Sequence, residues 1–501
     1  MDAADRAALD AAITDFEPLF TAQEAFVALE RAVLAASESF VAGFRVFDPQ
    51  TTLRSAEARA LGNTWFDLIL AKLNAGVRFE ITLTDFDPVI ATDDHRRSWS
   101  AARQFAALNE LSTGARCDCR VALHPARAGI VPRLVLHGKT SQELSDKDTD
   151  ALTPGLAEAK AAAVAPLVPA THHQKLAVID DQLLYIGGLD LNDRRYDTRD
   201  HARPAQETWY DIQALVKGPV VAAASAHLHS FRAACAGTEA PNPATPGFLR
   251  TLSVGRQLPV AHISPKPRVT ELEDAHMSAI RRARGLIYFE TQFFRHMPLA
   301  EAIAEAALAN PALACVLVLP AAPEDVAFEG NRREDAQLGA QKQADALGLL
   351  SEALQDRLAL VSPARPCAAP TRPVGGDMAT LHGAPIIYVH AKLSLFGEAE
   401  AIVSSANLNG RSLRWDTEAG VHLVRPAFVR QLWQRALTHW MGDLAPDPTG
   451  DARAFVTDIR TAAARNAATP PADRRHLLLP YPMDRPRALA SPLPMVPDEM
   501  V

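Results

Sequence analysis

Short runs of apolar residues alternate along the chain with longer segments in which apolar residues recur every three or four positions. Two early runs are typical of strands: SFVAGFRVFDP (39–49) and GVRFEITLTDFDP (76–88). Helical spacing follows them over residues 54–74 and 95–112, and CRVALH (119–124) is another short strand. This order predicts strands that alternate with helices, as in an α/β fold.

The second half of the chain repeats the same order of elements. Three strands and a helix (219–236) close the first half: HQKLAVID, LLYIGGLDL and WYDIQALVKG. The second half predicts helices over 269–284, 297–309, 335–355 and 426–442, with the strands GLIYFETQFF, ACVLVLP, AKLSLF, AIVSSANL and EAGVHLV between them. We therefore expect an internal duplication, two repeats that each hold a mixed sheet flanked by helices and face each other across a pseudo-twofold axis.

The length of the chain indicates more than one domain. With 501 residues the chain is too long for one ordinary core. We expect an N-terminal helical lead (1–24), a first repeat (25–240), a Pro-rich linker (237–247), a second repeat (250–445) and a C-terminal extension (446–501). From about residue 466 that extension is expected to be an extended Pro-rich tail on the surface. A long connection over 124–170, rich in Pro, Ala and Asp, interrupts the first repeat.

The charge and the termini limit the partners. The net charge of −8 gives no bulk attraction to a nucleic-acid backbone. The five cysteines are sparse and odd in number, as expected for free thiols in a reducing compartment. The N-terminus lacks the basic and apolar regions of a signal peptide, and no apolar run reaches the ~18 residues of a membrane span. We expect a cytoplasmic protein, or one peripheral at the inner membrane face.

The chemistry begins with a tripeptide, H-x-K, that opens two of the predicted strands. Residues two apart on a strand share a face, so His173 projects beside Lys175, and His390 beside Lys392. Two such pairs in one cleft would suit a phosphodiester. One His can attack phosphorus, the other can protonate the leaving oxygen, and the lysines can stabilise charge on the non-bridging oxygens. This chemistry requires no metal and no cofactor.

A third H-x-K shows that the tripeptide alone is weak evidence. His137-Gly138-Lys139 leads into polar residues and is expected to be a structural loop. The other two copies each precede an apolar strand and then a second strand that ends in small residues and a polar group: YIGGLDLN and VSSANLNGRS.

These longer segments carry a family resemblance. The chain resembles the phospholipase D superfamily, whose signature is two copies of H-x-K-x4-D, each followed by G-[GS]-x-N. The first copy matches with His173, Lys175 and Asp180. GGLDLNDRRYDT, WYDIQALVKGP, IYFETQFF, IYVHAKLSLF and SSANLNGRSL are similar to the phosphatidylcholine-type phospholipases D, over roughly residues 25–445. The resemblance implies two repeats with one active site between them, in which Asp180 supports the motif.

The chain also departs from the family pattern. In the second copy Gly397 occupies the acid position, with Glu398 one residue late, and Ser404 stands where Gly is usual. In the first copy Asp190 stands where many relatives have Asn, although the phosphatidylcholine-type enzymes also carry Asp there. A carboxylate near a phosphate is unfavourable unless a cation pairs with it. We expect Asp190 to lie in the cleft.

Further residues complete the expected site. A catalytic His needs a partner on one ring nitrogen, and Asp211 and Glu418, at corresponding strand starts, are expected to orient the two histidines. Exposed strand-end acids are the alternative. Asn407 is expected to bind phosphate with the two lysines, or else to cap a strand. Glu290 and Gln292 flank the cleft or support the fold, and His172 points to the opposite face.

The expected function is that of a phospholipase D, which hydrolyses or transphosphatidylates the distal phosphodiester bond of a glycerophospholipid. Phosphatidic acid would form through a phosphohistidine, with His173 as nucleophile and His390 as acid and base. A phosphodiesterase acting on nucleic acid, a cardiolipin-synthase-like transferase and a non-catalytic binding module are alternatives. We expect a monomer that meets its substrate at a membrane surface.

Overall fold

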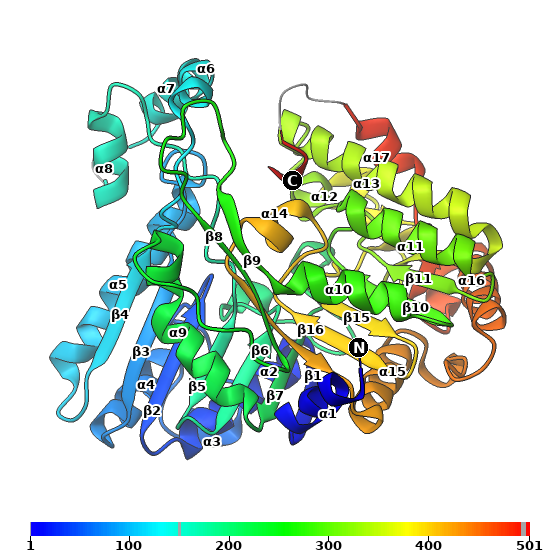
Figure 1. Cartoon of the computed structure of the whole chain (residues 1–501), viewed down its shortest axis with the longest axis horizontal. Helices are drawn as coiled ribbons and strands as arrows, with labels where there is room; N and C mark the ends of the chain where they lie inside the picture. Colours follow the sequence, from blue (N-terminus) through cyan, green and yellow to red (C-terminus); the bar gives the residue numbers. More distant parts are fainter. Residues whose placement is uncertain (1, 149–151, 492–496, 501) are drawn as a thin grey trace.

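The computed structural model describes residues 2–148, 152–491 and 497–500. Two mixed β-sheets pack against each other, and helices cover the outer face of each sheet (Figure 1). The chain therefore forms a helix–sheet–sheet–helix arrangement around a shared central core.

The first sheet has seven strands in the order β1-β7-β6-β5-β2-β3-β4. β2, β3 and β4 are parallel, whereas β5, β6, β7 and β1 are added to β2 as successive antiparallel neighbours. The strands are β1 (Asp15–Phe20), β2 (Ser39–Phe44), β3 (Arg78–Thr84), β4 (Cys117–Ala122), β5 (Leu176–Ile179), β6 (Leu183–Gly187) and β7 (Ile212–Lys217).

The second sheet repeats this order and adds one strand at each edge: β18-β12-β11-β10-β15-β16-β17-β8-β9. β8, β17, β16, β15, β10, β11 and β12 correspond in order and relative direction to β1, β7, β6, β5, β2, β3 and β4. The predicted fold class, two repeats with mixed sheets, is thereby confirmed. The strands are β8 (Phe248–Val254), β9 (Lys266–Thr270), β10 (Leu286–Thr291), β11 (Ala314–Val318), β12 (Leu358–Pro363), β15 (Lys392–Phe396), β16 (Glu400–Ser404), β17 (Glu418–Leu423) and β18 (Leu478–Pro480), with a separate hairpin of β13 (Thr380–Leu381) and β14 (Ala384–Pro385).

Alternation along the central strands explains how one sheet serves two cores. In β5, Leu176 and Val178 pack between the sheets, whereas Ala177 and Ile179 pack against the outer helices. The equivalent strand β15 sends Leu393 and Leu395 into the same central core. Because both faces are buried, these strands are continuous apolar runs, and burial of that surface joins the two repeats into one body.

The helices divide between the layers. α2 (Thr21–Ala35), α4 (Trp65–Asn74) and α5 (Thr92–Leu111) cover the first sheet, and α10 (Glu271–Arg282), α11 (Met297–Ala309) and α13 (Glu334–Leu354) cover the second. α9 (Val220–Ala236) and α15 (Pro426–Met441) pack on the central core. The other α-helices are α1 (Ala3–Ala12), α3 (Ala56–Arg59), α6 (Ile130–Val135), α7 (His137–Ser145), α8 (Pro154–Ala161), α12 (Glu324–Phe328), α14 (Gly410–Arg414), α16 (Ala452–Ala468) and α17 (Asp484–Leu489). Among the described helices, none has the length and hydropathy needed to span a bilayer.

Most predicted elements are present, with local differences. The helix predicted over 297–309 is α11, and that over 426–442 is α15. The helix predicted over 54–74 is broken into α3 and α4. Thr64 and Asp67 form a capping box that starts α4 anew, because each side chain satisfies a backbone N–H that would otherwise lack a partner.

Three expectations about the connecting segments were wrong. The N-terminal lead is not only helical, since β1 pairs with β7 along the edge of the first sheet. The 124–170 connection contains α6, α7 and α8, and His137-Gly138-Lys139 begins α7 instead of forming a loop. The C-terminal extension is not simply a surface tail: α16 is followed by β18, which pairs with β12 of the second sheet. Residues 492–496 and 501 of that extension lie outside the described residues.

Candidate active site

The two H-x-K motifs lie at equivalent places, where the central strands of the two sheets begin. His173 comes just before β5, and His390 just before β15. Each motif is hydrogen-bonded to the other repeat: the His173 amide donates to the Thr417 carbonyl at 2.8 Å, and the His390 amide donates to the Tyr210 carbonyl at 2.7 Å. The pseudo-symmetric contacts hold both motifs at the boundary between the repeats.

The two histidines are each paired with a carboxylate from the opposite repeat. Nδ1 of His173 lies 2.9 Å from Oε1 of Glu418, and Nδ1 of His390 lies 2.5 Å from Oδ2 of Asp211. Both carboxylates are fully buried, whereas the His173 and His390 side chains keep 14% and 8% of their surface exposed. A carboxylate at Nδ1 fixes that nitrogen as the protonated one, which leaves Nε2 of each ring for a substrate.

The lysines sit beside the histidines of their own motifs. Lys175 Nζ donates to the His173 carbonyl and lies 3.3 Å from Nε2 of the same ring. Lys392 Nζ donates to the His390 carbonyl. Both side chains are buried, and burial lowers the pKa of Lys175 and lowers that of Lys392 to about 7. An anion in the site would favour the charged form of both lysines.

Burial dominates the protonation of the histidines and their partners. Burial, followed by the charges of Lys175 and Arg45, holds the pKa of His173 well below its usual range. Burial and Lys392 do the same for the pKa of His390. Burial also raises the pKa of Asp211 to about 7 and that of Glu418 to about 8. Both imidazoles are therefore neutral in the free protein, the state in which a His can act as a nucleophile or a base.

The strand-end segments predicted to bind phosphate also lie here. Asn407 is buried, and its Oδ1 has no hydrogen-bond partner in the described parts of the chain. Asp190, at the equivalent position of the first repeat, has the cation that its burial requires: its carboxylate lies 3.5 Å from Nη1 of Arg45 and accepts a hydrogen bond from the Val46 amide at 3.0 Å. The pairing offsets the repulsion between this carboxylate and a phosphate.

The small residues of these segments have a geometric cause. Ser405 donates a hydrogen bond of 2.5 Å to Oε2 of Glu418, so it fixes the carboxylate that holds His173. In the first repeat the equivalent residue is Gly188, where a Cβ would come within 2.2 Å of Oδ1 of Asp211. The two repeats therefore differ at this position: Ser405 donates a hydrogen bond to Glu418, whereas Gly188 has no side chain and so leaves room for Asp211.

Asp180 and Gly397 end their strands away from the histidines. Both have left-handed backbones, with φ of 51° and 57°, a conformation open to Gly and tolerated by Asp. The Asp180 carboxylate accepts hydrogen bonds from the amides of Ser37, Glu38 and Ser39, at 2.7–2.8 Å, at the start of β2. Asp180 thus anchors β5 to β2, and Gly397 keeps the backbone shape without the anchor.

Glu290 supports the fold, and Gln292 lines a different cavity. The buried Glu290 carboxylate accepts hydrogen bonds from Tyr210 and Tyr288 at 2.6 Å and from Trp440 at 2.7 Å. Those three donors occupy it, so Glu290 is not free to bind a ligand. Gln292 donates to the Tyr388 hydroxyl at 2.7 Å and faces a cavity in the second repeat.

Sequence reasoning missed three residues around the histidines. Arg45 pairs with Asp190, and Arg195 lies 3.5 Å from the ring centroid of Trp209. The Trp209 ring in turn lies 4.4 Å from the His390 ring. The only local signal was the position of Arg45 at the end of a predicted strand, and charged residues at strand ends are too common to single out.

One group of potential metal ligands occurs among the described residues: His124, His172 and Cys235, all buried behind the His173 motif. His172 does point away from His173, as expected, and its Nδ1 lies 2.8 Å from the Thr417 hydroxyl. Nδ1 of His124 accepts a hydrogen bond from the Ala126 amide, so its proton is on Nε2. A neutral His124 in this tautomer has no free lone pair for a metal. The arrangement of His124, His172 and Cys235 is therefore better explained by hydrogen bonding than by metal coordination.

Comparison with known proteins supports the architecture. No protein-family model and no curated protein sequence matches the chain. Among solved structures, phosphatidylserine synthase from Haemophilus influenzae matches with a TM-score of 0.53 at 12% identity, over 87% of this chain and 90% of that one. Polyphosphate kinase from Porphyromonas gingivalis gives a TM-score of 0.42 at 9% identity, over 88% and 54% of the two chains. NucT from Helicobacter pylori gives 0.22 at 12% identity, over 32% and 83%. The likeness to the synthase shows a shared fold across nearly the whole of both chains.

Proposed function

We propose that the protein is a phosphodiesterase of the phospholipase D type that transfers the phosphatidyl group of a glycerophospholipid to water or to an alcohol. The observation that carries this proposal is the crossed pair of His–carboxylate contacts, His173 with Glu418 and His390 with Asp211. Two oriented imidazoles with two buried lysines provide a nucleophile, a proton donor and positive charge without further groups.

In the first step Nε2 of His173 attacks phosphorus, and the bond from phosphorus to the head-group oxygen breaks. The head-group alcohol leaves with a proton from Nε2 of His390, whose pKa rises when the anionic phosphodiester binds nearby. Glu418 stabilises the positive charge that develops on the His173 ring. Lys175, Lys392 and the Asn407 amide donate to the non-bridging oxygens.

In the second step the neutral His390 removes a proton from water or an alcohol, and that oxygen attacks the phosphohistidine. The phosphorus–nitrogen bond breaks, and His173 is regenerated. Water gives phosphatidic acid, and an alcohol gives a new phosphodiester. The role of His173 as nucleophile follows the family resemblance and the fuller first motif, and it remains part of the proposal.

An apolar tip supports a lipid substrate over nucleic acid. Ile130, Val131, Leu134 and Val135 of α6, with Leu258 and Val260 of the β8–β9 loop, are 40–84% exposed. The two segments are joined by hydrogen bonds from the Ile130 and Val131 amides to the carbonyls of Pro259 and Val260, and Figure 1 shows α6 and this loop together at one end of the molecule.

The tip has a small core of its own, formed by Val89, Ala128, Ala159, Ala165 and Leu167. Its outward apolar side chains are therefore not needed to complete that core, and such a patch is typical of a surface that meets a membrane or a partner. The connection that forms α6 continues along the chain to His173. A tip inserted at a bilayer surface would hold the protein at the layer of lipid head groups.

The test is a panel of phospholipid vesicles assayed with and without ethanol, scored for phosphatidic acid and phosphatidylethanol. We expect both products in ethanol and phosphatidic acid alone without it, and neither from His173→Asn. Transfer to an alcohol with negligible hydrolysis would favour the second candidate, a phosphatidyltransferase, which the fold shared with a phosphatidylserine synthase suggests. Cleavage of DNA or RNA, with no turnover of any lipid, would contradict the proposal.

A further inference from the structure

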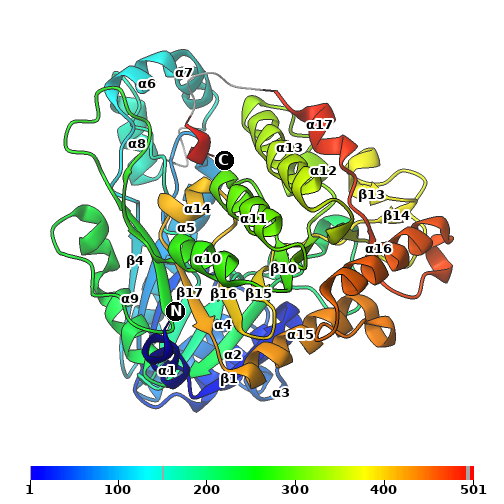
Figure 2. The ribbon, with the colours of Figure 1, turned by 45° about the vertical axis from the view of Figure 1, so that its right-hand side comes forward.

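A small cavity lies within the second repeat, apart from the His–Lys cluster, with a volume of about 30 Å³ open to the centre of a water molecule. Its walls come from the segment after β10, from the end of β11, and from α12, α13 and α17, which lie together in both Figure 1 and Figure 2. Most of the lining is apolar, including Ala321, Pro323, Val326 and Leu489. The exception that matters is Arg295.

The Arg295 side chain makes no hydrogen bond and no ion pair with the described residues, and its Nε is buried without a partner. Its guanidinium lies 3.8 Å from the centroid of the Phe293 ring and beside Gly339 of α13, and Asp325 and Asp335 act on it through their charge without a direct contact. By contrast Arg485, which also lines the cavity, donates to the carbonyls of Met378 and Asp377, each at 3.2 Å. A guanidinium has five N–H donors: the Nε donor is buried without an acceptor, which is costly, and the Nη donors are left without a protein acceptor among the described residues, where a ligand can accept them.

The position of Arg295 is built into α13. A Cβ added to Gly339, within that helix, would come 2.6 Å from Nη1 and 2.7 Å from Cζ of Arg295. Glycine inside a helix costs about 0.5–1 kcal/mol relative to alanine, so its use here needs a packing reason. The same helix carries Gly348, where an added Cβ would meet nothing within 4 Å.

Two hydrogen bonds tie the lining of the cavity to segments of the second repeat's half of the active site. The Arg295 amide donates to the Leu408 carbonyl at 2.9 Å, and Leu408 follows Asn407 in the chain. On the other side, Gln292 lines the cavity and donates to the hydroxyl of Tyr388, two residues before His390. The cavity is thus connected at both sides to segments that carry proposed substrate-binding groups.

We propose that this cavity binds an anionic group, a carboxylate or a phosphate, on the alcohol that the enzyme releases from or adds to the phosphatidyl unit. The inference rests on the proposed function and sharpens its substrate class. Arg295 can bind such a group by donating two parallel N–H···O hydrogen bonds to its oxygens. A choline head group has a fixed positive charge and no acceptor, so the same guanidinium would repel it. The cavity therefore selects serine-like or phosphate-bearing head groups over choline.

The kinetic test compares kcat/KM on phosphatidylserine and phosphatidylcholine vesicles for the wild type and three full-length variants. We expect Arg295→Gln to lower the value on phosphatidylserine about 10- to 100-fold, since a matched charged hydrogen-bonding group carries most of such discrimination, and to raise the value on phosphatidylcholine, because the repulsion of choline is lost. Gly339→Ala should reproduce this loss by displacing the guanidinium. Gly348→Ala is the matched control and should not.

A binding test separates this inference from the proposed function. In calorimetric titration with inorganic phosphate, the wild type should bind at two sites, Arg295→Gln should lose one, and Lys392→Gln should lose the other. Two phosphate sites that persist in Arg295→Gln would overturn the cavity. Phosphate binding that needs Arg295, combined with a head-group preference that does not, would assign the cavity to a free anion and overturn the head-group role. Arg295-dependent binding in a protein that turns over no phospholipid would contradict the proposed function instead.

Discussion

The crossed pairing of histidines and carboxylates makes a prediction that neither repeat would suggest alone. Replacing Glu418, in the second repeat, should impair the step performed by His173, in the first. Glu418→Gln keeps the size of the side chain and an oxygen for the Ser405 hydroxyl, and at pH 9, above the Glu418 pKa of about 8, it removes a negative charge 2.9 Å from Nδ1 of His173. We therefore expect this variant to behave like a weaker form of His173→Asn.

The magnitude follows from the contact. Two unit charges about 4 Å apart attract by about 4 kcal/mol at an effective dielectric constant of about 20. A charge-assisted hydrogen bond alone contributes about 1.5–3 kcal/mol. Because each 1.36 kcal/mol is a factor of ten, the attack of His173 should slow by between about ten- and a thousand-fold.

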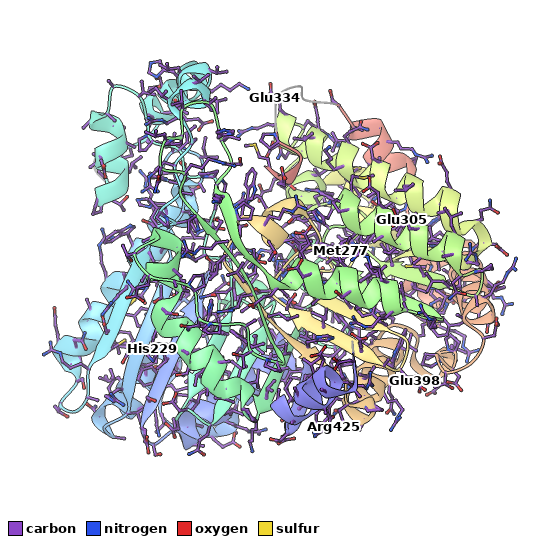
Figure 3. The ribbon with its side chains drawn as sticks, in the orientation of Figure 1. His229, Met277, Glu305, Glu334, Glu398 and Arg425 are labelled. Atoms are coloured by element: carbon purple, nitrogen blue, oxygen red, sulfur yellow. The ribbon has the colours of Figure 1, made fainter. Side chains whose placement is uncertain are left out.

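The assay is rapid-quench mass spectrometry at pH 9 with a nitrophenyl phosphodiester, which needs little help from an acid for its leaving group. Glu418→Gln should slow formation of the phosphoryl adduct on His173. Asp211→Asn should spare formation of the adduct and slow its hydrolysis, because Asp211 holds His390. Glu398→Gln is the control, since Glu398 is the acid one residue past the second motif's expected position, beside α15 in Figure 3. If Glu418→Gln spared adduct formation and Asp211→Asn blocked it, the reasoning from crossed pairs would be refuted.

Three further predictions concern stability, pH and the membrane. Asp180→Ala should lower the free energy of unfolding by about 1–3 kcal/mol in urea titrations, because it leaves three backbone amides at the start of β2 without their acceptor. A loss of adduct formation by a variant that still folds would contradict a purely anchoring role. Burial raises the pKa of Glu418 from 4.5 to about 8, so the wild type loses stability as pH rises through that interval, whereas Glu418→Gln does not. The unfolding free energy of the variant relative to the wild type should therefore grow from pH 5 to pH 9. A difference that stays constant over this range would contradict the raised pKa. Val135→Ser should weaken co-sedimentation with anionic vesicles several-fold relative to Leu308→Ser. Leu308, on α11, is the control because its side chain is equally exposed, at 75%. Equal losses in the two variants would contradict membrane binding by the apolar tip.

Much of the fold was determined by local pattern. Strand alternation and helical spacing depend on neighbouring residues, so most elements of both repeats could be predicted, α11 to its last residue. The repetition of the H-x-K strands and of the small-residue segments after them likewise identified His173, Lys175, His390 and Lys392. These features were accessible because each is complete within a few residues of sequence.

Pairings between distant segments were decided only by the tertiary structure. Sequence spacing indicated Asp211 and Glu418 as orienting groups but not which His each one holds, since the partners are 179 and 245 residues apart. β1 was missed because its six residues include Asp15, Glu17 and Pro18, and β18 because it has only three residues; both pair with strands far along the chain.

The same limit applies to polar residues whose role depends on their surroundings. Glu290 and Arg295 lie five residues apart near the end of one strand, and only Glu290 was a candidate site residue. Packing gives Glu290 three hydrogen-bond donors and gives the Arg295 side chain no acceptor among the described residues. The sequence specifies which charges the chain carries, but burial and the partners brought by folding decide which of them are satisfied within the protein and which are left for a ligand.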